Sequence, residues 1–302
     1  MGLRINNNIE SMVAHRNLLK NDRALSKSLE RLASGQKVNR AADDPAALVI
    51  SEHMRSKING MEQSIRNNEI AISLVQTAEG SMNEISSLLI GIRQRAISAA
   101  NVGASDKAMT AANQAEIENA LSSLDRIVSS TQFGQHKLLD GTNARKTLED
   151  GTSKEGLRFH VGPDAGHIAS ISIKSMTSSQ LGRVAEGEMP NASNFMSLAD
   201  IDVSTEQGSQ DALAIIDEAI TEVATVRGEL GAFQTNTLES NLTSLQIAAE
   251  NMTSAESTIR DAEMAKELAT FTRNQIMTQS AMAQLAQANA MPQNVLRLLA
   301  NQ

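Results

Sequence analysis

Residues 54–75 read MRSKINGMEQSIRNNEIAISLV, and this stretch decides the fold class. Its apolar side chains follow steps of four and three, with polar Asn68 at one position of the series. The apolar members are Met54, Ile58, Met61, Ile65, Ile72 and Val75. A sustained period of 3.5 residues places a narrow apolar stripe along a helix, and such a stripe is buried against partner helices. The stretch therefore predicts one seam of a coiled coil or helical bundle.

The same spacing recurs at both ends of the chain. Leu18, Leu25 and Leu32 are seven residues apart, and Leu29 lies four residues after Leu25 and three before Leu32. Late in the chain the sevenfold repeat continues through Leu238, Leu245, Met252 and Ile259, with Leu242 between the first two. Proline is absent from residues 46–162 and 191–291, so the strongest helix breaker is missing from both stretches. We expect two long helical arms.

One long helix over 46–102 would extend about 85 Å at 1.5 Å per residue. Gly60, Gly80 and Gly91 weaken that expectation, since each costs about 1 kcal/mol relative to alanine within a helix. The centre, roughly 141–206, is instead rich in glycine and turn-forming residues. Within it, residues 157–161 and 168–174 resemble two short strands around a Gly/Pro loop, which predicts a hairpin packed on the helices.

The fold class expected from these patterns is mainly α. Two helical arms, N-terminal and C-terminal, form an elongated antiparallel coiled-coil or bundle rod, and a small central β-hairpin accompanies them. Aromatic residues make up only 2% of the chain and cysteine is absent, so a thick core, a disulfide or a thiolate metal site is not expected. The apolar content suits slender helix seams.

Catalytic and cofactor motifs are missing as well. The sequence holds no H-E-x-x-H pair and no phosphate-binding glycine loop, so we expect no enzyme, no metal and no cofactor. The acidic pair Asp43-Asp44 precedes Pro45, which is typical of a helix N-terminus rather than of an acid/base site. Residues 1–40 are basic, yet they hold no dense basic run or aromatic residue, so nucleic acid is not an expected partner. No apolar run is long enough for insertion into a membrane.

Several longer motifs carry a resemblance to a known family. They are SLERLASG at 28–35, NRAADD at 39–44, QTAEG at 76–80, SAAN at 98–101, LLDG at 138–141, IRDAEMA at 259–265 and AQANAMPQNVL at 286–296. These motifs closely resemble the terminal regions of bacterial flagellins, over about 1–142 and 208–302. Two signatures of several residues each, at opposite ends and in the right order, make the resemblance specific.

The resemblance implies a domain organisation and a function. A terminal coiled coil, D0, would comprise 1–43 and 260–302, and a helical rod, D1, would comprise 44–259 with the hairpin at about 157–174. No outer domain, D2 or D3, is expected. The chain would be a secreted structural subunit that self-assembles into the helical filament of the bacterial flagellum, the propeller for swimming. The expected partners are further copies of itself, a flagellin export chaperone, the flagellar export apparatus, and the hook-associated junction and cap proteins.

The resemblance also implies which residues carry these roles. The D0 subunit interface would use Ile5, Leu18, Leu25, Leu29, Leu32, Leu285, Val295, Leu296, Leu298 and Leu299. The family motif at the D0–D1 junction would use Arg31, Asn39, Ala41, Ala42, Asp43, Asp44, Arg260 and Asp261. The D1 seam would use Met54, Ile58, Met61, Ile65, Ile72, Val75, Leu238, Leu242, Leu245 and Met252. The seams at the two ends suggest arms that become ordered only when neighbouring subunits bury them.

One patch departs from the family pattern. The flagellin-sensing Toll-like receptor favours an Arg where Gly91 stands and a Leu where Arg95 stands, and Arg93 lies between them. Losing a guanidinium and an apolar anchor removes contacts of the kind that dominate binding energy. The resemblance therefore implies weak or absent receptor signalling.

Two alternatives remain at this stage. A hook–filament junction protein resembles flagellin at both ends, although the QAN–PQ run at 287–293 and the match over 76–101 favour the filament protein. A cytoplasmic signalling rod of the chemoreceptor type is also rich in alanine, patterned in heptads and free of cysteine. That alternative predicts a symmetric helical hairpin without a β element, whereas this centre is rich in glycine and resembles strands.

Overall fold

The computed structural model describes residues 8–101, 106–144, 146–147, 153–154, 156–183 and 192–300, with side chains for those within 8–144, 156–183 and 192–291. The chain divides into two compact units. The first comprises Met1–Ile58 and Glu250–Gln302, and the second comprises Asn59–Ala249. The boundaries between the units fall within two long helices. The mainly helical fold class predicted from the sequence is confirmed.

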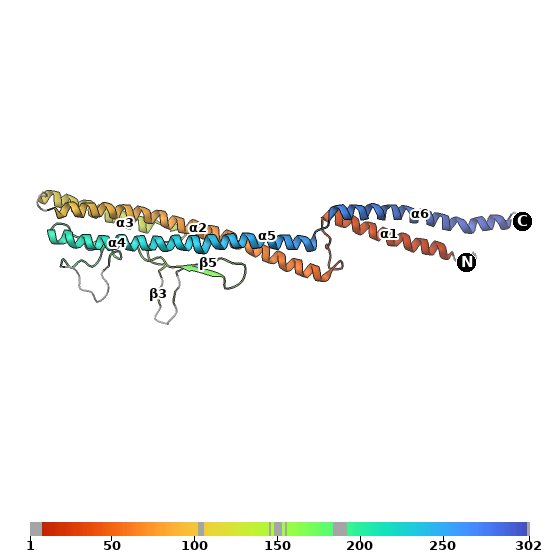
Figure 1. The fold of residues 1–302 in the computed structure, drawn as a ribbon, viewed down its shortest axis with the longest axis horizontal. Coiled ribbons are helices and arrows are strands. Elements are labelled where there is room, and N and C mark those ends of the chain that lie inside the picture. Colours follow the sequence, from red (N-terminus) through yellow and green to blue (C-terminus); the bar gives the residue numbers. More distant parts are fainter. Residues whose placement is uncertain are drawn as a thin grey trace. The chain divides into compact units, whose positions relative to one another are not determined.

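The first unit is built on a pair of antiparallel helices, α1 (Ile9–Ser34) and α6 (Met264–Ala300), which lie side by side (Figure 1). Helix α1 begins at Asn8, whose side chain accepts a hydrogen bond from the backbone N–H of Ser11. It ends at Gly35, which adopts the left-handed conformation with φ 71° and donates its N–H to the carbonyl of Arg31. Glycine is favoured there because a Cβ would strain this backbone.

Helix α2 (Pro45–Ala100) is one unbroken helix of 56 residues despite its three glycines. The predicted start is confirmed: Pro45 is the first helical residue, and the Asp44 Oδ1 accepts the backbone N–H of Ala47 at 3.0 Å. Within the second unit its buried positions alternate in steps of three and four. They are Met61, Ser64, Asn68, Ala71, Val75, Ala78, Met82, Ile85, Leu89, Ile92, Ala96 and Ala99, and Leu74 is buried beside Val75. Packing along this seam outweighs the propensity cost of the glycines.

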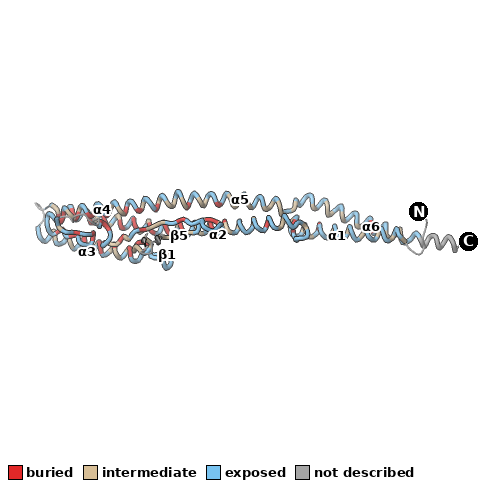
Figure 2. Tube along the Cα trace, turned by 90° about the horizontal axis from the view of Figure 1, so that it is seen from below, coloured by how far each residue is buried: buried red, intermediate tan, exposed pale blue. Residues whose placement is uncertain are grey.

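The core of the second unit lies between α2, α3 (Lys107–Ser130) and α4 (Glu206–Ala232). Figure 2 shows the buried residues gathered along these helices. Helix α3 contributes aliphatic side chains such as Ile117 and Leu124, which are wholly buried. A short 3-10 helix, η1 (Leu198–Asp200), and a loop through Ile201 and Val203 cover the core.

Between α4 and α5 (Ser240–Arg260) lies a seven-residue π-helix, η2 (Phe233–Glu239). The helical course is continuous across it, because Ala232 and Ser240 both keep right-handed helical dihedrals. Buried positions in α4 alternate by three and four up to Leu230, but the next buried residue is Leu238, eight positions later. A π-helix accommodates one extra residue within a helix. The π-helix between Leu230 and Leu238 absorbs the extra residue in its wider turn. Leu238 therefore returns to the core side of the helix.

Among the described residues of the second unit, three antiparallel strand pairs accompany the helices. They are β1 (Gln132–Phe133) with β2 (His136–Lys137), β3 (Lys146–Thr147) with β4 (Ser153–Lys154), and β5 (Leu157–His160) with β6 (Ile168–Ile171). The last pair is the hairpin predicted from the sequence, somewhat shorter than the expected 157–161 and 168–174. Its register pairs Leu157 with Ile171 and His160 with Ile168.

The β5–β6 hairpin is held on the helices through two neighbouring backbone carbonyls. The carbonyl of His160 accepts a hydrogen bond from Asn67 Nδ2 on α2 at 3.1 Å. The carbonyl of Val161 accepts a hydrogen bond from Asn68 Nδ2 on α2 at 3.3 Å and from Asn241 Nδ2 on α5 at 2.6 Å. Gly60 leaves room for the hairpin loop, since a Cβ there would lie 3.2 Å from the Cβ of Pro163. The polar interruption of the heptad at Asn68 is therefore the docking point of the hairpin.

Candidate assembly surface

Apolar side chains in the first unit are mostly exposed. Among the described residues of this unit, the only buried apolar side chains are Val38 and Ala281. The large apolar side chains that face solvent are Ile9, Met12, Val13, Leu19, Leu29, Val49, Ile50, Met264, Leu268, Ile276, Met277, Met282 and Met291. An exposed apolar set of this size marks an interaction surface.

The seam between α1 and α6 is small and polar. On α1 it runs through Ser11, Ala14, Leu18, Asn21, Leu25, Ser28 and Leu32, which are partly or fully buried in steps of three and four. Asn21 Nδ2 donates to the carbonyl of Met277 at 3.3 Å, and Asn274 Nδ2 donates to Ser28 Oγ at 3.3 Å. Such a seam sets the antiparallel register of the two helices but buries little apolar area, so it stabilises the pair weakly.

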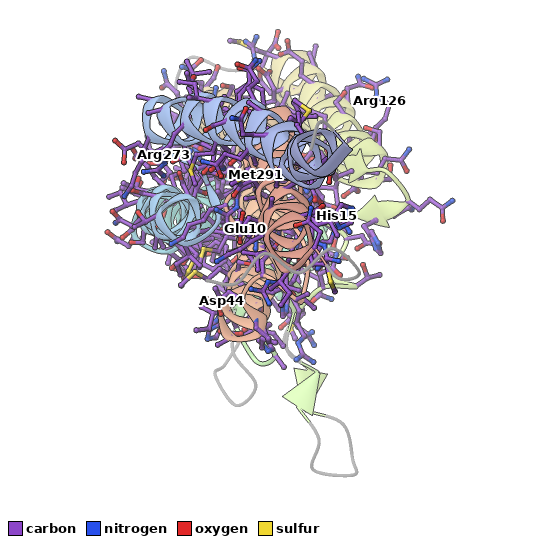
Figure 3. All side chains as sticks on the ribbon, turned by 90° about the vertical axis from the view of Figure 1, so that its right-hand side faces the viewer. Glu10, His15, Asp44, Arg126, Arg273 and Met291 are labelled. Atoms are coloured by element: carbon purple, nitrogen blue, oxygen red, sulfur yellow. The ribbon has the colours of Figure 1, made fainter. Side chains whose placement is uncertain are left out.

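Helix α6 carries a second apolar stripe on the side turned away from this seam. Its members line a shallow groove of about 610 Å³ and are Ala265, Leu268, Ala269, Thr272, Arg273, Ile276 and Met277. Leu268 is 57% exposed and Ile276 is 61% exposed. In Figure 3, Arg273 of α6 and His15 of α1 project outward from the helix pair. The stripe repeats every three and four residues, which suits packing against another helix.

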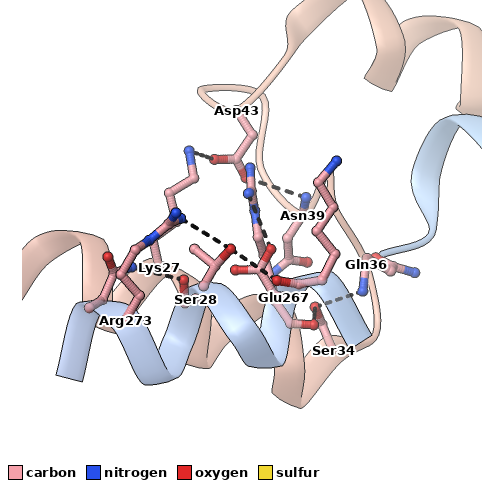
Figure 4. A network of polar contacts seen from close by, with 12 residues as sticks. Lys27, Ser28, Ser34, Gln36, Asn39, Asp43, Glu267 and Arg273 are labelled. Atoms are coloured by element: carbon pink, nitrogen blue, oxygen red, sulfur yellow. Dashed lines mark hydrogen bonds and ion pairs between the residues drawn. The ribbon is translucent and has the colours of Figure 1, made fainter. Parts of the chain in front are cut away.

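A polar network joins the end of α1 to the loop that leads into α2 (Figure 4). Asp43 accepts hydrogen bonds from Lys27 Nζ at 2.7 Å and from the backbone N–H of Arg40 at 3.1 Å. Glu30 Oε1 accepts from Arg40 Nε at 2.7 Å and from Asn39 Nδ2 at 2.8 Å. The hydrogen bond from Lys27, followed by the backbone N–H groups of Arg40 and Asn39, holds the pKa of Asp43 below its usual value.

The connection from α1 to α2 and the connection from α5 to α6 meet through their backbones. Gln36 forms an antiparallel bridge with Asp261, and the N–H of Ala262 donates to the carbonyl of Gly35 at 2.9 Å. Arg260 donates to Glu52 Oε1 at 2.7 Å, and this hydrogen bond lowers the pKa of Glu52. The predicted junction residues therefore lie in several separate contacts. Asn39 and Asp43 belong to the network of Lys27, Arg40 and Glu30, while Arg31 pairs with Glu267 at 3.7 Å and Asp44 caps α2. Arg260 and Asp261 lie at the second connection, and Ala41 and Ala42 are exposed.

The residues proposed from the sequence for the D0 interface fall into three groups. Leu18, Leu25, Leu32 and Leu285 are partly buried within the α1–α6 pair, whereas Leu29 is 57% exposed. Ile5 lies outside the described residues, and Val295, Leu296, Leu298 and Leu299 lie outside the described side chains. Sequence reasoning missed the exposed stripe of α6 and the exposed residues Ile9, Met12, Val13 and Leu19. The spacing of these apolar residues can be read from the sequence. It does not show which apolar stripe is buried within the subunit and which stays exposed.

The residues proposed for the D1 seam differ in burial. Met61, Val75, Leu238 and Leu245 are buried, while Met54, Ile58, Ile65, Ile72, Leu242 and Met252 are partly buried. Between Met61 and Val75, the other buried positions of α2 are Ser64, Asn68, Ala71 and Leu74.

The patch that departs from the family pattern lies on α2. Arg93 Nε binds Asp217 of α4 at 2.6 Å, and this carboxylate raises the pKa of Arg93. Arg95 Nε binds Glu116 of α3 at 2.7 Å. A Cβ at Gly91 would meet no atom within 4 Å. The two arginines therefore bridge helices of the same unit.

Within the described part of the chain, no group of three or more His, Asp or Glu side chains is arranged to hold a metal ion. None of the described helices is long and apolar enough to cross a membrane.

Comparison with known proteins gives a consistent result. Residues 5–144 match the family described as bacterial flagellin N-terminal helical region, and residues 213–299 match bacterial flagellin C-terminal helical region. A flagellin of Bacillus subtilis is 40% identical over 98% of this chain and 100% of its own length. A flagellar filament 30.7 kDa core protein of Treponema maltophilum is 37% identical over 98% of this chain and 99% of its own length. A Vibrio parahaemolyticus protein described as flagellar hook-associated shares the fold, with a TM-score of 0.58 at 16% identity, over 72% of this chain and 100% of its own.

Proposed function

This chain belongs to the bacterial flagellin family and is a structural subunit of the flagellar filament, and we propose that its copies join through the exposed apolar side chains of α1 and α6. As in its relatives, the subunit is exported and polymerises into the extracellular helical filament that serves swimming. The proposal extends this function to particular residues.

The observation that carries the proposal is the unequal burial of the two units. The second unit buries an aliphatic seam along α2, whereas the first exposes most of its large apolar residues. Fully burying a leucine or isoleucine side chain gains about 1.5–3 kcal/mol. An open helical polymer can bury this surface because each subunit meets further copies on more than one side.

The division into D0 and D1 is part of the proposal. We assign 1–43 and 260–302 to D0 and 44–259 to D1, with no outer domain. The backbone contacts of Gly35 and Gln36 with Ala262 and Asp261 support a boundary near these positions, because they join the α1–α2 connection to the α5–α6 connection. The unit boundaries at Ile58 and Glu250 lie further into α2 and α5.

Partners beyond further copies belong to the proposal as well. An export chaperone that covers the apolar stripe of α6 would keep subunits from polymerising before export, since Leu268 and Ile276 are open in the monomer. The export apparatus and the hook-associated junction and cap proteins are the other partners that membership of the family suggests.

Polymerisation of matched variants tests the assembly surface. Subunits are dissociated in acid, neutralised, salted out and examined by electron microscopy and sedimentation. We compare the wild-type chain with a Leu268→Ser/Ile276→Ser double variant, and with Ile247→Ser as a control because Ile247 is 55% exposed in the second unit. The double variant should raise the critical concentration at least about a hundredfold, given two lost apolar burials. Uniform filaments of the double variant at the wild-type concentration would refute the proposal, and wild-type monomers that bind only to hook or filament ends would indicate a junction protein.

Receptor recognition is proposed to be weak. Arg93 and Arg95 are held in ion pairs with Asp217 and Glu116, and Gly91 offers no side chain. Reporter cells that express the flagellin-sensing Toll-like receptor should respond weakly or not at all to purified monomer. A robust response would contradict this part of the proposal.

A further inference from the structure

Methionine is concentrated on the candidate assembly surface. Helix α6 exposes Met264, Met277, Met282 and Met291, each between 46% and 50% accessible. In the second unit Met61, Met82 and Met176 are buried, at 8% exposure or less, whereas Met109 and Met196 are exposed. On α1, Met12 is 69% exposed. The chain contains no cysteine, tryptophan or tyrosine. Thioether sulfurs are therefore its most readily oxidised groups, and the reactive ones lie largely on α6.

We infer that the four exposed methionines of α6 form an oxidation-sensitive site that controls whether a subunit can join a filament. This inference rests on the proposed function, because it requires that the α6 surface becomes buried between copies. Met277 lines the apolar groove beside Leu268 and Ile276. Met264 and Met282 lie 18 residues apart, which is five helical turns, so they share one flank of α6.

The oxidant is a peroxide, for which hydrogen peroxide is the simplest case. A sulfur lone pair attacks one peroxide oxygen, an S–O bond forms, the O–O bond breaks, and water leaves with the second oxygen. Sulfur loses two electrons and the peroxide gains them. The product is methionine sulfoxide, a polar side chain that methionine sulfoxide reductases convert back to the thioether.

A sulfoxide on this surface opposes assembly. Each oxygen must be removed from water when copies pack, and an apolar helix face offers it no donor. The expected result is a critical concentration that rises roughly tenfold for each sulfoxide left unpaired in the lattice. Once a filament has formed, the same sulfurs are covered and react slowly, so oxidation acts mainly on free subunits.

The test compares full-length variants before and after treatment with hydrogen peroxide. In every chain compared, the wild-type reference included, Met12 of α1, which is 69% exposed, is replaced with Leu so that its oxidation does not contribute. One variant also replaces Met264, Met277, Met282 and Met291 with Leu, a swap that nearly conserves volume. The control replaces Met109 and Met196, which are 47% and 49% exposed in the second unit. Oxidised wild-type chain and oxidised control should both fail to form filaments at the concentration that suffices untreated, whereas the α6 variant should assemble. Sulfoxide reductases A and B should restore wild-type assembly.

Site-resolved mass spectrometry keeps the test decisive if the α6 variant does not assemble. Partially oxidised wild-type subunits are allowed to polymerise, and filaments are separated from the remaining monomer. Sulfoxide at the four α6 positions should be depleted from filaments, while sulfoxide at Met109 and Met196 should be equal in both fractions. Equal partition at all positions, or unchanged assembly of oxidised wild-type chain, would overturn the inference. Failure of untreated wild-type chain to polymerise would instead refute the proposed function.

Discussion

Removing one residue from the π-helix should leave the fold intact, whereas removing one residue from α4 should not. An α-helix turns about 100° per residue, so eight residues of α-helix would rotate Leu238 about 80° away from the direction of Leu230. Leu238 is nevertheless fully buried. The π-helix supplies the missing rotation, and Gln234 donates to Glu239 Oε1 across five residues at 2.8 Å, a pairing that this geometry permits. Deleting exposed Asn236 would place Leu230 and Leu238 seven residues apart, about 20° from alignment in an ordinary α-helix.

The magnitudes favour a clear difference. Deleting Asn236 brings Gln234 and Glu239 four residues apart, a spacing at which the exposed pair can persist, so this contact changes stability by at most about 0.2–0.5 kcal/mol. Deleting exposed Ala224 from α4 instead turns the following seam by about 100°, which takes Val226 and Leu230 out of the core. Removing a large aliphatic side chain from a core costs about 2–5 kcal/mol, so the loss approaches the whole stability of an ordinary domain, about 5–15 kcal/mol.

The assay is thermal unfolding of the full-length monomer, followed by circular dichroism at matched concentration. The Asn236 deletion should keep the wild-type Tm within about 4 °C, given about 2–4 °C per kcal/mol for units of this size. The Ala224 deletion should lower Tm by more than 10 °C or prevent folding, on the same conversion. Equal losses in the two deletions would refute the idea that the π-helix corrects the register of the seam.

Three further outcomes are expected. The hydrogen bond from Lys27 is the main cause that lowers the pKa of Asp43 in the folded protein. The ionised Asp43 carboxylate therefore stabilises the fold at pH values above its unfolded-state pKa near 3.8. This contribution is lost as the pH falls through the lower pKa of Asp43 in the folded state. Asp43→Asn should therefore flatten the acid-unfolding profile below about pH 5. Gly182→Ala should destabilise the second unit by at least about 1–3 kcal/mol, because φ is +61° and the added Cβ would lie 2.6 Å from a carbonyl oxygen of α4. As a matched control, Gly80→Ala on α2 adds a Cβ in open space and should raise Tm slightly. In hydrogen exchange of the monomer, amides of α1 and α6 should exchange faster than those of the α2 seam and should gain protection on polymerisation; full protection before polymerisation would argue against arms completed by neighbours.

Local signals in the sequence were enough for much of the fold. The heptad after Met54 and the Asp44–Pro45 start predicted the long helix α2, and the Val/Ile runs around a Gly/Pro loop predicted the hairpin. The family motifs at the two ends predicted a filament subunit, which the comparisons confirm. These features depend on residues that are close in sequence, so they can be predicted without a structure.

Features that depend on residues far apart in sequence could not be predicted in the same way. The extra residue before Leu238 breaks the buried spacing, but nothing local distinguishes a π-helix from a helix end. The pairing of Arg93 with Asp217 joins residues 124 positions apart. Periodicity alone also left open which apolar stripes the chain covers. Leu18 and Leu25 pack within the α1–α6 pair, whereas Leu268 and Ile276 stay exposed.

The carbonyl of Val161 has a consequence for the order of folding events. Its two donors, Asn68 and Asn241, come from helices separated by more than half the chain. Neither helix can complete this contact alone, and closing so long a loop costs entropy before any packing repays it. The second unit should therefore fold slowly and late, after most of the polypeptide has been delivered to one place. Until residues near Asn241 are present, the hairpin lacks one of the two hydrogen bonds that hold the Val161 carbonyl on the helices.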